Sequence, residues 1–242
     1  MMIIAVQMNS SDHPHIFFDL DHTLWDFEAN AEATLRELYD YYDIVNRTDS
    51  SVDVFIQTYS RVNNRYWALY RKQQVSKADL RVQRFTDTFA EVGIERADIP
   101  KGIWEHYIEI CPTKTQLMAG AKETLDYLSQ NHKLHLITNG FEETQHRKLK
   151  NTKLEQYFQS LTISEVVGSQ KPSPYIFKQA LLNAGLTAEE STYVGDNFEA
   201  DVQGGINAGW QVFWLNETNS HPDFTHPKLV RIKKLLELKK HF

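Results

Sequence analysis

Short, nearly continuous apolar runs alternate with helical patterns along much of the chain. The run His15-Ile-Phe-Phe-Asp19 ends in an acid and is typical of a strand buried on both faces. Similar runs span Leu134 to Thr138, Leu161 to Ser164, Thr192 to Val194 and Gln211 to Leu215. Helical patterns between them span Ala121 to Leu128, Tyr175 to Leu182 and Ala200 to Ala208. Because strands and helices alternate, the pattern predicts an α/β fold with a Rossmann-like parallel sheet.

The stretch from residue 33 to residue 113 shows helical patterns only. Apolar residues recur every three or four positions from Phe55 to Leu69 and from Val82 to Val92, and Gly93 favours a helix end. Since this block lies between the first two predicted strands, it is an insertion into the α/β unit. We therefore expect a core domain of residues 1–32 and 114–242 and an inserted all-helical cap domain of residues 33–113.

Composition excludes several classes of protein. The chain has 242 residues, of which 41% are hydrophobic and 24% charged, so it can bury a sizeable core and is not disordered throughout. Its apolar runs are far shorter than the ~20 residues of a membrane helix, and no signal peptide is expected. Met1 and Met8 are alternative starts. The single cysteine, Cys111, fits a reducing compartment and hence a cytoplasmic location.

Charge is unevenly distributed. The net charge of −6 argues against a protein that binds nucleic acid over its whole surface. Residues 61–84, however, hold seven basic residues and one acidic residue, with Tyr66, Trp67 and Tyr70 interleaved. In one interpretation this is an anion-attracting face on which Trp67 contacts the substrate. In the other, the charges lie on solvated helix faces and Tyr66 and Tyr70 belong to the cap core. A nucleic-acid-binding protein that uses this stretch is a remote alternative.

Polar residues follow the predicted strands. Ligands of open parallel sheets bind at the carboxyl ends of the strands, so these residues are expected to converge. The residues in question are Asp19, Asp21, Thr138, Asn139, Lys171, Asp196 and Asp201. Carboxylates packed so closely repel one another unless a cation lies among them, and hard oxygen ligands suit magnesium. The sequence therefore predicts an Mg²⁺ site at this edge of the sheet.

The same residues fit the chemistry of phosphate ester hydrolysis. Mg²⁺ held by carboxylates commonly completes its shell with phosphate oxygens, and a nearby hydroxyl and lysine suit the other phosphoryl oxygens. One carboxylate can attack phosphorus and form an aspartyl phosphate. A second carboxylate two residues later can protonate the leaving alcohol and then accept a proton from water. Taken singly, an aspartate can instead cap a helix, a lysine lie on the surface, and Asn-Gly form an ordinary turn.

Four segments resemble, in order, the motifs of the haloacid dehalogenase superfamily of phosphohydrolases. They are Phe17-Phe-Asp19-Leu-Asp21-His-Thr23-Leu24, Ile137-Thr-Asn-Gly140, Lys171-Pro-Ser-Pro174 and Gly195-Asp196-x4-Asp201. The resemblance implies that Asp19 is the nucleophile and Asp21 the general acid and base. It implies that Thr138, Asn139 and Lys171 bind the phosphate. It also implies Mg²⁺ ligands at Asp19, Asp196 and the backbone carbonyl of Asp21, with Asp201 positioning metal-bound water.

Further resemblances bear on the substrate. The superfamily's true dehalogenases lack the second acid, so Asp21 favours phosphate esters, and the helical insertion resembles the superfamily's small cap. Residues 136–141, 163–168 and 204–216 are similar to the pyrimidine nucleoside monophosphate phosphatases of the superfamily. This implies a small-molecule substrate, a nucleoside 5′-monophosphate with a pyrimidine preferred. A phosphatase for a sugar phosphate or phosphoglycolate is the alternative, and both a monomer and a dimer stay open.

Overall fold

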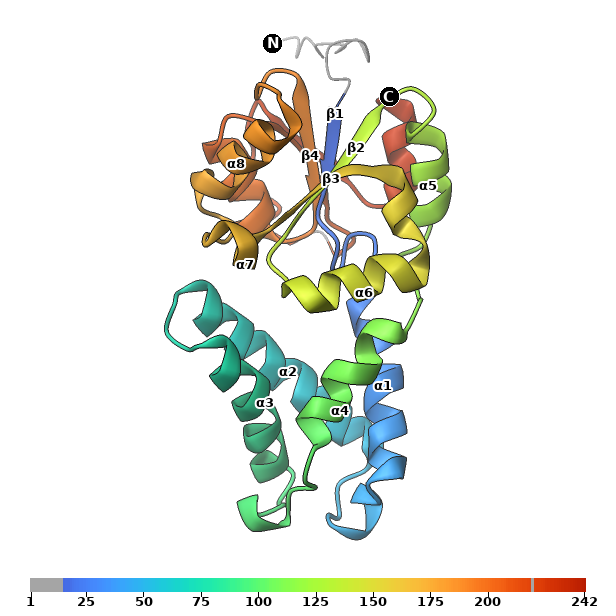
Figure 1. Cartoon of the computed structure of the whole chain (residues 1–242), viewed down its shortest axis with the longest axis vertical. Helices are drawn as coiled ribbons and strands as arrows, with labels where there is room; N and C mark the ends of the chain where they lie inside the picture. The colour runs from blue at the N-terminus through green and yellow to red at the C-terminus, as the bar shows by residue number, and fades with distance from the viewer. Residues whose placement is uncertain (1–14, 219) are drawn as a thin grey trace. The chain divides into compact units, whose positions relative to one another are not determined.

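The computed structural model describes residues 15–218 and 220–242, so the alternative starts Met1 and Met8 lie outside it (Figure 1). The chain forms two compact units. One contains the residues up to Asp26 together with Gln116–Phe242, and the other is Phe27–Thr115. The helix α1 (Phe27–Tyr41) opens the second unit, so the boundary expected at residue 33 falls inside this helix. We call the first unit the core unit and the second the cap unit.

The core unit is built on a parallel sheet, which confirms the predicted α/β fold. Within the described residues the strand order is β3-β2-β1-β4-β5-β6, and every neighbouring pair is parallel. The strands are β1 (His15–Phe18), β2 (Lys133–Thr138), β3 (Phe158–Ile163), β4 (Ser191–Gly195), β5 (Gln211–Leu215) and β6 (Leu229–Ile232). The first five match the apolar runs of the sequence. The edge strand β6 was not predicted.

Helices cover both faces of this sheet, with α8 on one side and α5 on the other (Figure 1). The helices of the core unit are α5 (Ala121–Leu128), α6 (Glu142–Thr152), α7 (Ser164–Val167), α8 (Pro174–Ala184) and α9 (Gly204–Asn207), with a π-helix at Phe198–Gln203. Short 3-10 helices lie at Leu154–Tyr157 and Leu235–Lys240. Fully buried aromatic residues, among them Phe17, Phe177, Tyr193 and Trp210, pack one continuous core between α8 and the sheet.

The cap unit is helical in all its described elements. It contains α1, α2 (Val52–Arg71), α3 (Lys77–Glu91) and α4 (Ile103–Ile110), with 3-10 helices at Ile44–Asn46, Arg96–Asp98 and Cys111–Thr113. The Ser76 side chain and Asp79 form a capping box that begins α3, and Gly93 adopts a left-handed φ of 82° just beyond its end. The apolar stripes predicted from the sequence meet in the interior, where Tyr59 packs against Phe85 and Tyr107. No helix of the described chain is long and apolar enough to cross a membrane.

The basic stretch of residues 61–84 is not a uniformly solvated positive face. Arg61 and Arg65 form ion pairs with Glu91 and Asp87 of α3, which lie just beyond the stretch. Arg84 is buried and donates to the Asn63 side chain over 2.9 Å. The three interleaved aromatic residues are half-buried, so Tyr66 and Tyr70 do not belong to the fully buried cap core. Neighbouring acids therefore offset part of the local charge that the sequence suggested.

A pair of histidines lies on neighbouring strands of the sheet. Nδ1 of His15 and Nε2 of His135 are 3.1 Å apart, and Nδ1 of His135 lies 2.8 Å from the Ser160 hydroxyl. The imidazole of His135 is 2% exposed and stacks on Phe17. Burial, helped by the positive charges of His15 and Lys133, lowers the pKa of His135 from 6.5 to about 4. The folded protein therefore holds this imidazole neutral at mildly acidic pH.

This neutral histidine predicts a loss of stability on acidification. Between pH 6.5 and 4 the unfolded state binds a proton at His135 that the folded state does not, so unfolding becomes easier as pH falls. We expect a His135→Gln variant to lose less stability than the wild type between pH 7 and pH 5, by on the order of 1–2 kcal/mol. Urea unfolding at both pH values measures this difference. A His146→Gln variant, at an exposed position, should lose as much stability as the wild type between the two pH values. An equal loss for His135→Gln and the wild type would contradict the prediction.

Candidate active site

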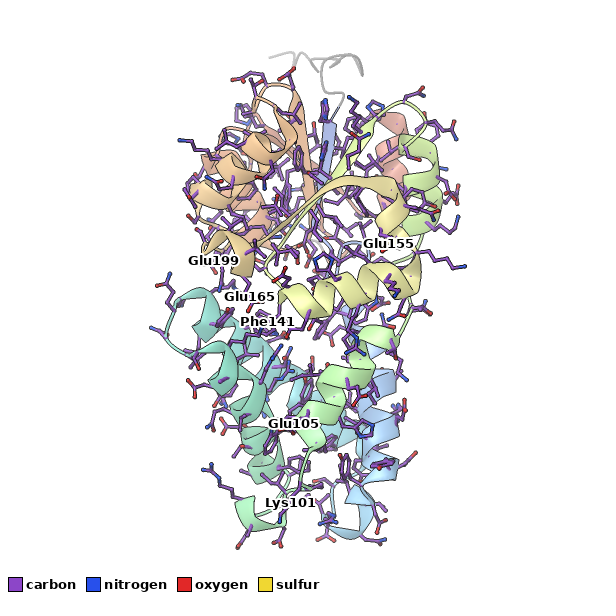
Figure 2. All side chains as sticks on the ribbon, viewed as in Figure 1. Lys101, Glu105, Phe141, Glu155, Glu165 and Glu199 are labelled. Carbon is purple, nitrogen blue, oxygen red and sulfur yellow. The ribbon has the colours of Figure 1, made fainter. Side chains whose placement is uncertain are left out.

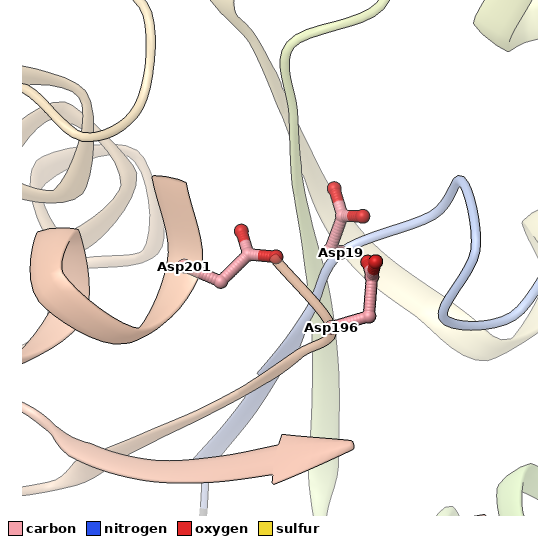
Figure 3. Close-up of side chains that lie close together, drawn as sticks. All are labelled: Asp19, Asp196 and Asp201. Atoms are coloured by element: carbon pink, nitrogen blue, oxygen red, sulfur yellow. The ribbon is translucent and has the colours of Figure 1, made fainter. Parts of the chain in front are cut away.

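Three of the predicted carboxylates converge at the carboxyl ends of the strands. Asp19 follows β1, Asp196 follows β4, and Asp201 lies in the π-helix (Figure 3). One oxygen atom from each side chain lies within 4.8 Å of the others. Asp201 is fixed by a hydrogen bond from the Asn197 backbone N–H over 2.9 Å. A β-carbon on Gly195 would lie 2.5 Å from the Asp201 carboxylate carbon, so only glycine leaves room for this carboxylate.

Lys171 binds two of these carboxylates. Its Nζ donates to Asp19 Oδ1 over 2.6 Å, to Asp201 Oδ1 over 2.7 Å and to the Tyr193 hydroxyl over 2.8 Å. The Asn139 side chain fixes the backbone of Lys171 from both sides: its Nδ2 donates to the Lys171 carbonyl over 2.9 Å, and its Oδ1 accepts from the Lys171 N–H over 2.8 Å. The Asn139 side chain thus holds the segment that carries Lys171. The predicted role of Asn139 in phosphate binding stays a prediction.

The electrostatics of this cluster favour a cation. Burial, joined by the charges of Asp201 and Asp196, raises the pKa of Asp19 to about 8, although the charge of Lys171 and its hydrogen bond oppose the shift. Burial and the charge of Asp201 likewise raise the pKa of Asp196 to about 7. A single lysine thus leaves excess negative charge among three hard oxygen donors. Such a donor set fits a divalent cation of the magnesium type.

Asp21 has different hydrogen-bond partners from the three clustered carboxylates. Its Oδ1 accepts from Lys148 Nζ over 2.5 Å, and its Oδ2 accepts from Gln145 Nε2 over 2.8 Å. Burial would raise the pKa of Asp21, but the charge of Lys148 and the hydrogen bonds from Lys148 and Gln145 outweigh it, so the pKa lies below its ordinary value. The Asp21 side chain is therefore held as a carboxylate by two residues of α6.

Thr138 ends β2 and is 1% exposed. Its hydroxyl oxygen accepts hydrogen bonds from the Gly140 N–H over 3.1 Å and from Gln145 Nε2 over 2.6 Å. Within residues 15–218 and 220–242 this hydroxyl donates to no other group. Because its acceptor positions are filled, its O–H is left to donate to a ligand oxygen.

Sequence reasoning missed three residues of this site, namely Gln145, Lys148 and Tyr193. Tyr193 lies in the middle of an apolar strand, and its hydroxyl was not expected to reach the lysine. Gln145 and Lys148 lie one turn apart on a helix with almost no apolar residues, so no hydropathy pattern distinguishes them. The predicted substrate contact Trp67 belongs to the cap unit, where it packs edge-on against Tyr70, and its role stays a prediction.

Comparisons with known proteins find relatives that align with most of the chain. The chain is 33% identical over 202 residues to the pyrimidine 5′-nucleotidase YjjG of Escherichia coli, covering 83% of this chain and 85% of that protein. It is 30% identical over 203 residues to the pyrimidine 5′-nucleotidase PynA of Streptococcus pneumoniae, covering 83% of each. The crystal structure of the HAD-hydrolase YfnB of Bacillus subtilis bound to magnesium is similar with a TM-score of 0.81 and 27% identity, covering 94% of this chain and 97% of that one.

The family assignment rests on the chain as a whole. The model of the haloacid dehalogenase-like hydrolase family matches residues 16–215, a range that includes all four motifs. The match confirms the resemblance that these motifs indicated. The chain belongs to the haloacid dehalogenase-like hydrolase family.

Proposed function

We propose that this hydrolase is an Mg²⁺-dependent phosphatase that forms an aspartyl phosphate on Asp19. The observation that carries the proposal is the cluster of Asp19, Asp196 and Asp201 around the buried Lys171 ammonium. Three carboxylates beside one lysine leave a negative site for a cation, and a cation there attracts a phosphate ester.

Asp19 and Asp196, with the backbone carbonyl of Asp21, would hold the Mg²⁺ ion. When bound, the ion supplies a positive charge that stabilises the negative phosphoryl oxygens. Asp201 accepts from both Lys171 and the Tyr193 hydroxyl, so it positions the lysine. We infer that it also accepts a hydrogen bond from metal-bound water. The magnesium-bound structure of the relative YfnB supports the choice of metal.

Hydrolysis then proceeds in two displacements. Lys171 binds Oδ1 of Asp19, which leaves Oδ2 to attack phosphorus while the bond from phosphorus to the ester oxygen breaks. Asp21, which the structure holds as a carboxylate, first takes up a proton from solvent and then gives it to that departing oxygen, while the Thr138 hydroxyl and Lys171 stabilise the phosphoryl oxygens. In the second displacement water attacks phosphorus and gives a proton to Asp21. The Asp19 carboxylate is restored and inorganic phosphate leaves.

The favoured substrate class is the nucleoside 5′-monophosphates, with pyrimidines preferred. Two relatives of at least 30% identity, which align with most of this chain, carry the name pyrimidine 5′-nucleotidase. The single buried cysteine, Cys111, fits action in the reducing cytoplasm. The ion pairs of Arg61 and Arg65 within the cap unit weaken the alternative of nucleic-acid binding by the basic stretch.

A substrate panel tests this proposal. We expect UMP, CMP and their deoxy forms to be hydrolysed with kcat/KM at least about 10-fold above AMP, GMP, sugar phosphates and phosphoglycolate. Chelation should abolish every activity, and excess Mg²⁺ should restore it. Release of inorganic phosphate is the measurement, and the Asp19→Asn variant, purified identically, controls for contaminating phosphatases. Preference for a sugar phosphate would reject the nucleotide assignment, and full activity in chelator would reject the metal.

A further inference from the structure

We propose that Gln145 and Lys148 are positioning residues that hold the Asp21 carboxyl group for proton transfer to the leaving oxygen. The inference rests on the proposed function, because it takes Asp21 as the general acid and base. Both Asp21 oxygens are engaged, one by each residue, at 2.5 Å and 2.8 Å. Two separate donors on one rigid helix fix both the place and the rotation of the carboxyl plane.

The ammonium group of Lys148 is buried, which is energetically unfavourable compared with a lysine on the surface. Its side chain is 5% exposed, and its Nζ lies 4.2 Å from the ring centroid of Trp25, on the same turn as Asp21. Burying an ammonium group is unfavourable, and a buried ion pair rarely stabilises a fold more than apolar side chains of the same size. The position of the pair beside the clustered carboxylates gives it a functional explanation.

Gln145 couples Asp21 to the phosphate-binding turn. The two hydrogens of its Nε2 go to Asp21 Oδ2 and to the Thr138 hydroxyl oxygen, so the same amide orients the acid and directs the Thr138 O–H toward a ligand. The turn leaves room for this amide only because residue 140 is glycine. A β-carbon there would lie 2.2 Å from Gln145 Nε2.

The helix that carries both residues is itself anchored at its start. The backbone N–H of Glu142, the first residue of α6, donates to Glu165 of α7 over 2.9 Å, next to Phe141 (Figure 2). This contact satisfies one of the free N–H groups at the helix N-terminus. Gln145 and Lys148 therefore project from a fixed base, one turn apart on one face of α6.

Aryl phosphates whose leaving groups differ in basicity test the inference. Phenyl phosphate releases a basic phenolate that needs a proton, whereas 2,4-dinitrophenyl phosphate releases a stable phenolate that does not. We expect Gln145→Leu and Lys148→Met to lower kcat/KM about 10- to 100-fold for phenyl phosphate and less than about 3-fold for the dinitrophenyl ester. Lys148→Arg should restore part of the loss. Lys150→Met, an exposed lysine on the same helix, is the matched control and should leave both values unchanged.

A double-mutant cycle separates positioning from a general structural role. If Lys148 and Gln145 act through Asp21, their substitutions should change kcat/KM for phenyl phosphate by less than about 2-fold in an Asp21→Asn background. Equal losses for both esters, or additive losses in the cycle, would overturn the inference. Thermal unfolding of each variant shows whether it is folded. If Lys148→Met is misfolded, Gln145→Leu and Lys148→Arg are used for the test. If Asp21→Asn lowers kcat/KM equally for both esters, Asp21 is not the general acid, and the proposed function is contradicted at that step instead.

Discussion

Replacement of Asp19 by asparagine is expected to lower turnover of every phosphate ester by at least about 10⁴-fold. Asparagine has nearly the same shape, but its amide is a poor nucleophile and cannot form the aspartyl phosphate. Lys171 can still donate to the amide oxygen over a contact like the present one of 2.6 Å. Phosphate release at saturating Mg²⁺, with quench-flow detection of phosphoenzyme in the wild type, measures the effect.

Stability distinguishes loss of the nucleophile from loss of the fold. Asp19 is a buried carboxylate whose pKa is raised to about 8 by burial and neighbouring acids, so its neutral replacement removes repulsion. We expect Asp19→Asn to unfold in chelator at a temperature no lower than the wild type, and Mg²⁺ to stabilise it less. Asp223→Asn, at an exposed position of the core unit, should keep full turnover. Substantial turnover by Asp19→Asn would exclude a covalent intermediate on this residue.

The sequence predicts strands β1 to β5 but misses the edge strand β6. Strands β1, β2, β4 and β5 are buried on both faces and therefore appear as apolar runs. The edge strand β6 reads Leu-Val-Arg-Ile, and three of its residues are half-buried. Its Arg231 lies 4.6 Å from the ring centroid of Trp214 and donates to loop carbonyls. Such contacts depend on the tertiary structure and leave no hydrophobic pattern.

The predicted helix at Ala200 to Ala208 shows a second limit. The structure divides it into a π-helix, Phe198–Gln203, and the short helix α9. Asn197 accepts from the Ala200 N–H and donates its own N–H to Asp201, so the turn is shaped by side chains of the site. A helical period in the sequence does not specify which ring of backbone hydrogen bonds closes the turn.

Site residues that directly follow a strand could be predicted from the sequence, whereas those on a helix face could not. Asp19 and Asp196 directly follow buried strands, so topology alone brings them together. Gln145 and Lys148 lie on α6, in which Leu149 is the one apolar residue, and polar character gives no sign of burial. Only the tertiary structure shows that these two side chains turn inward.

Replacement of Lys171 by methionine is expected to reduce both activity and stability. Methionine fills a similar volume but leaves Asp19 and Asp201 buried without their counter-charge. Removal of one partner from a buried ion pair commonly costs about 3–5 kcal/mol, so the free energy of unfolding in chelator should fall by roughly that amount. Turnover with Mg²⁺ should fall about 10³-fold, because the phosphoryl oxygens lose a fixed positive charge. Lys178→Met, at an exposed position on α8, is the matched control.

Mg²⁺ and a second substitution identify the cause of that loss. If unpaired carboxylates destabilise Lys171→Met, saturating Mg²⁺ should recover stability, since the ion replaces the missing positive charge. Asp19→Asn in the same chain should also recover stability in chelator, because it removes one of the two stranded carboxylates and the coupling is then non-additive. Urea unfolding of the wild type, both single variants and the double variant provides the four free energies of unfolding that the cycle needs. Additive losses, or no response to Mg²⁺, would show that methionine disturbs packing around Tyr193 rather than charge balance.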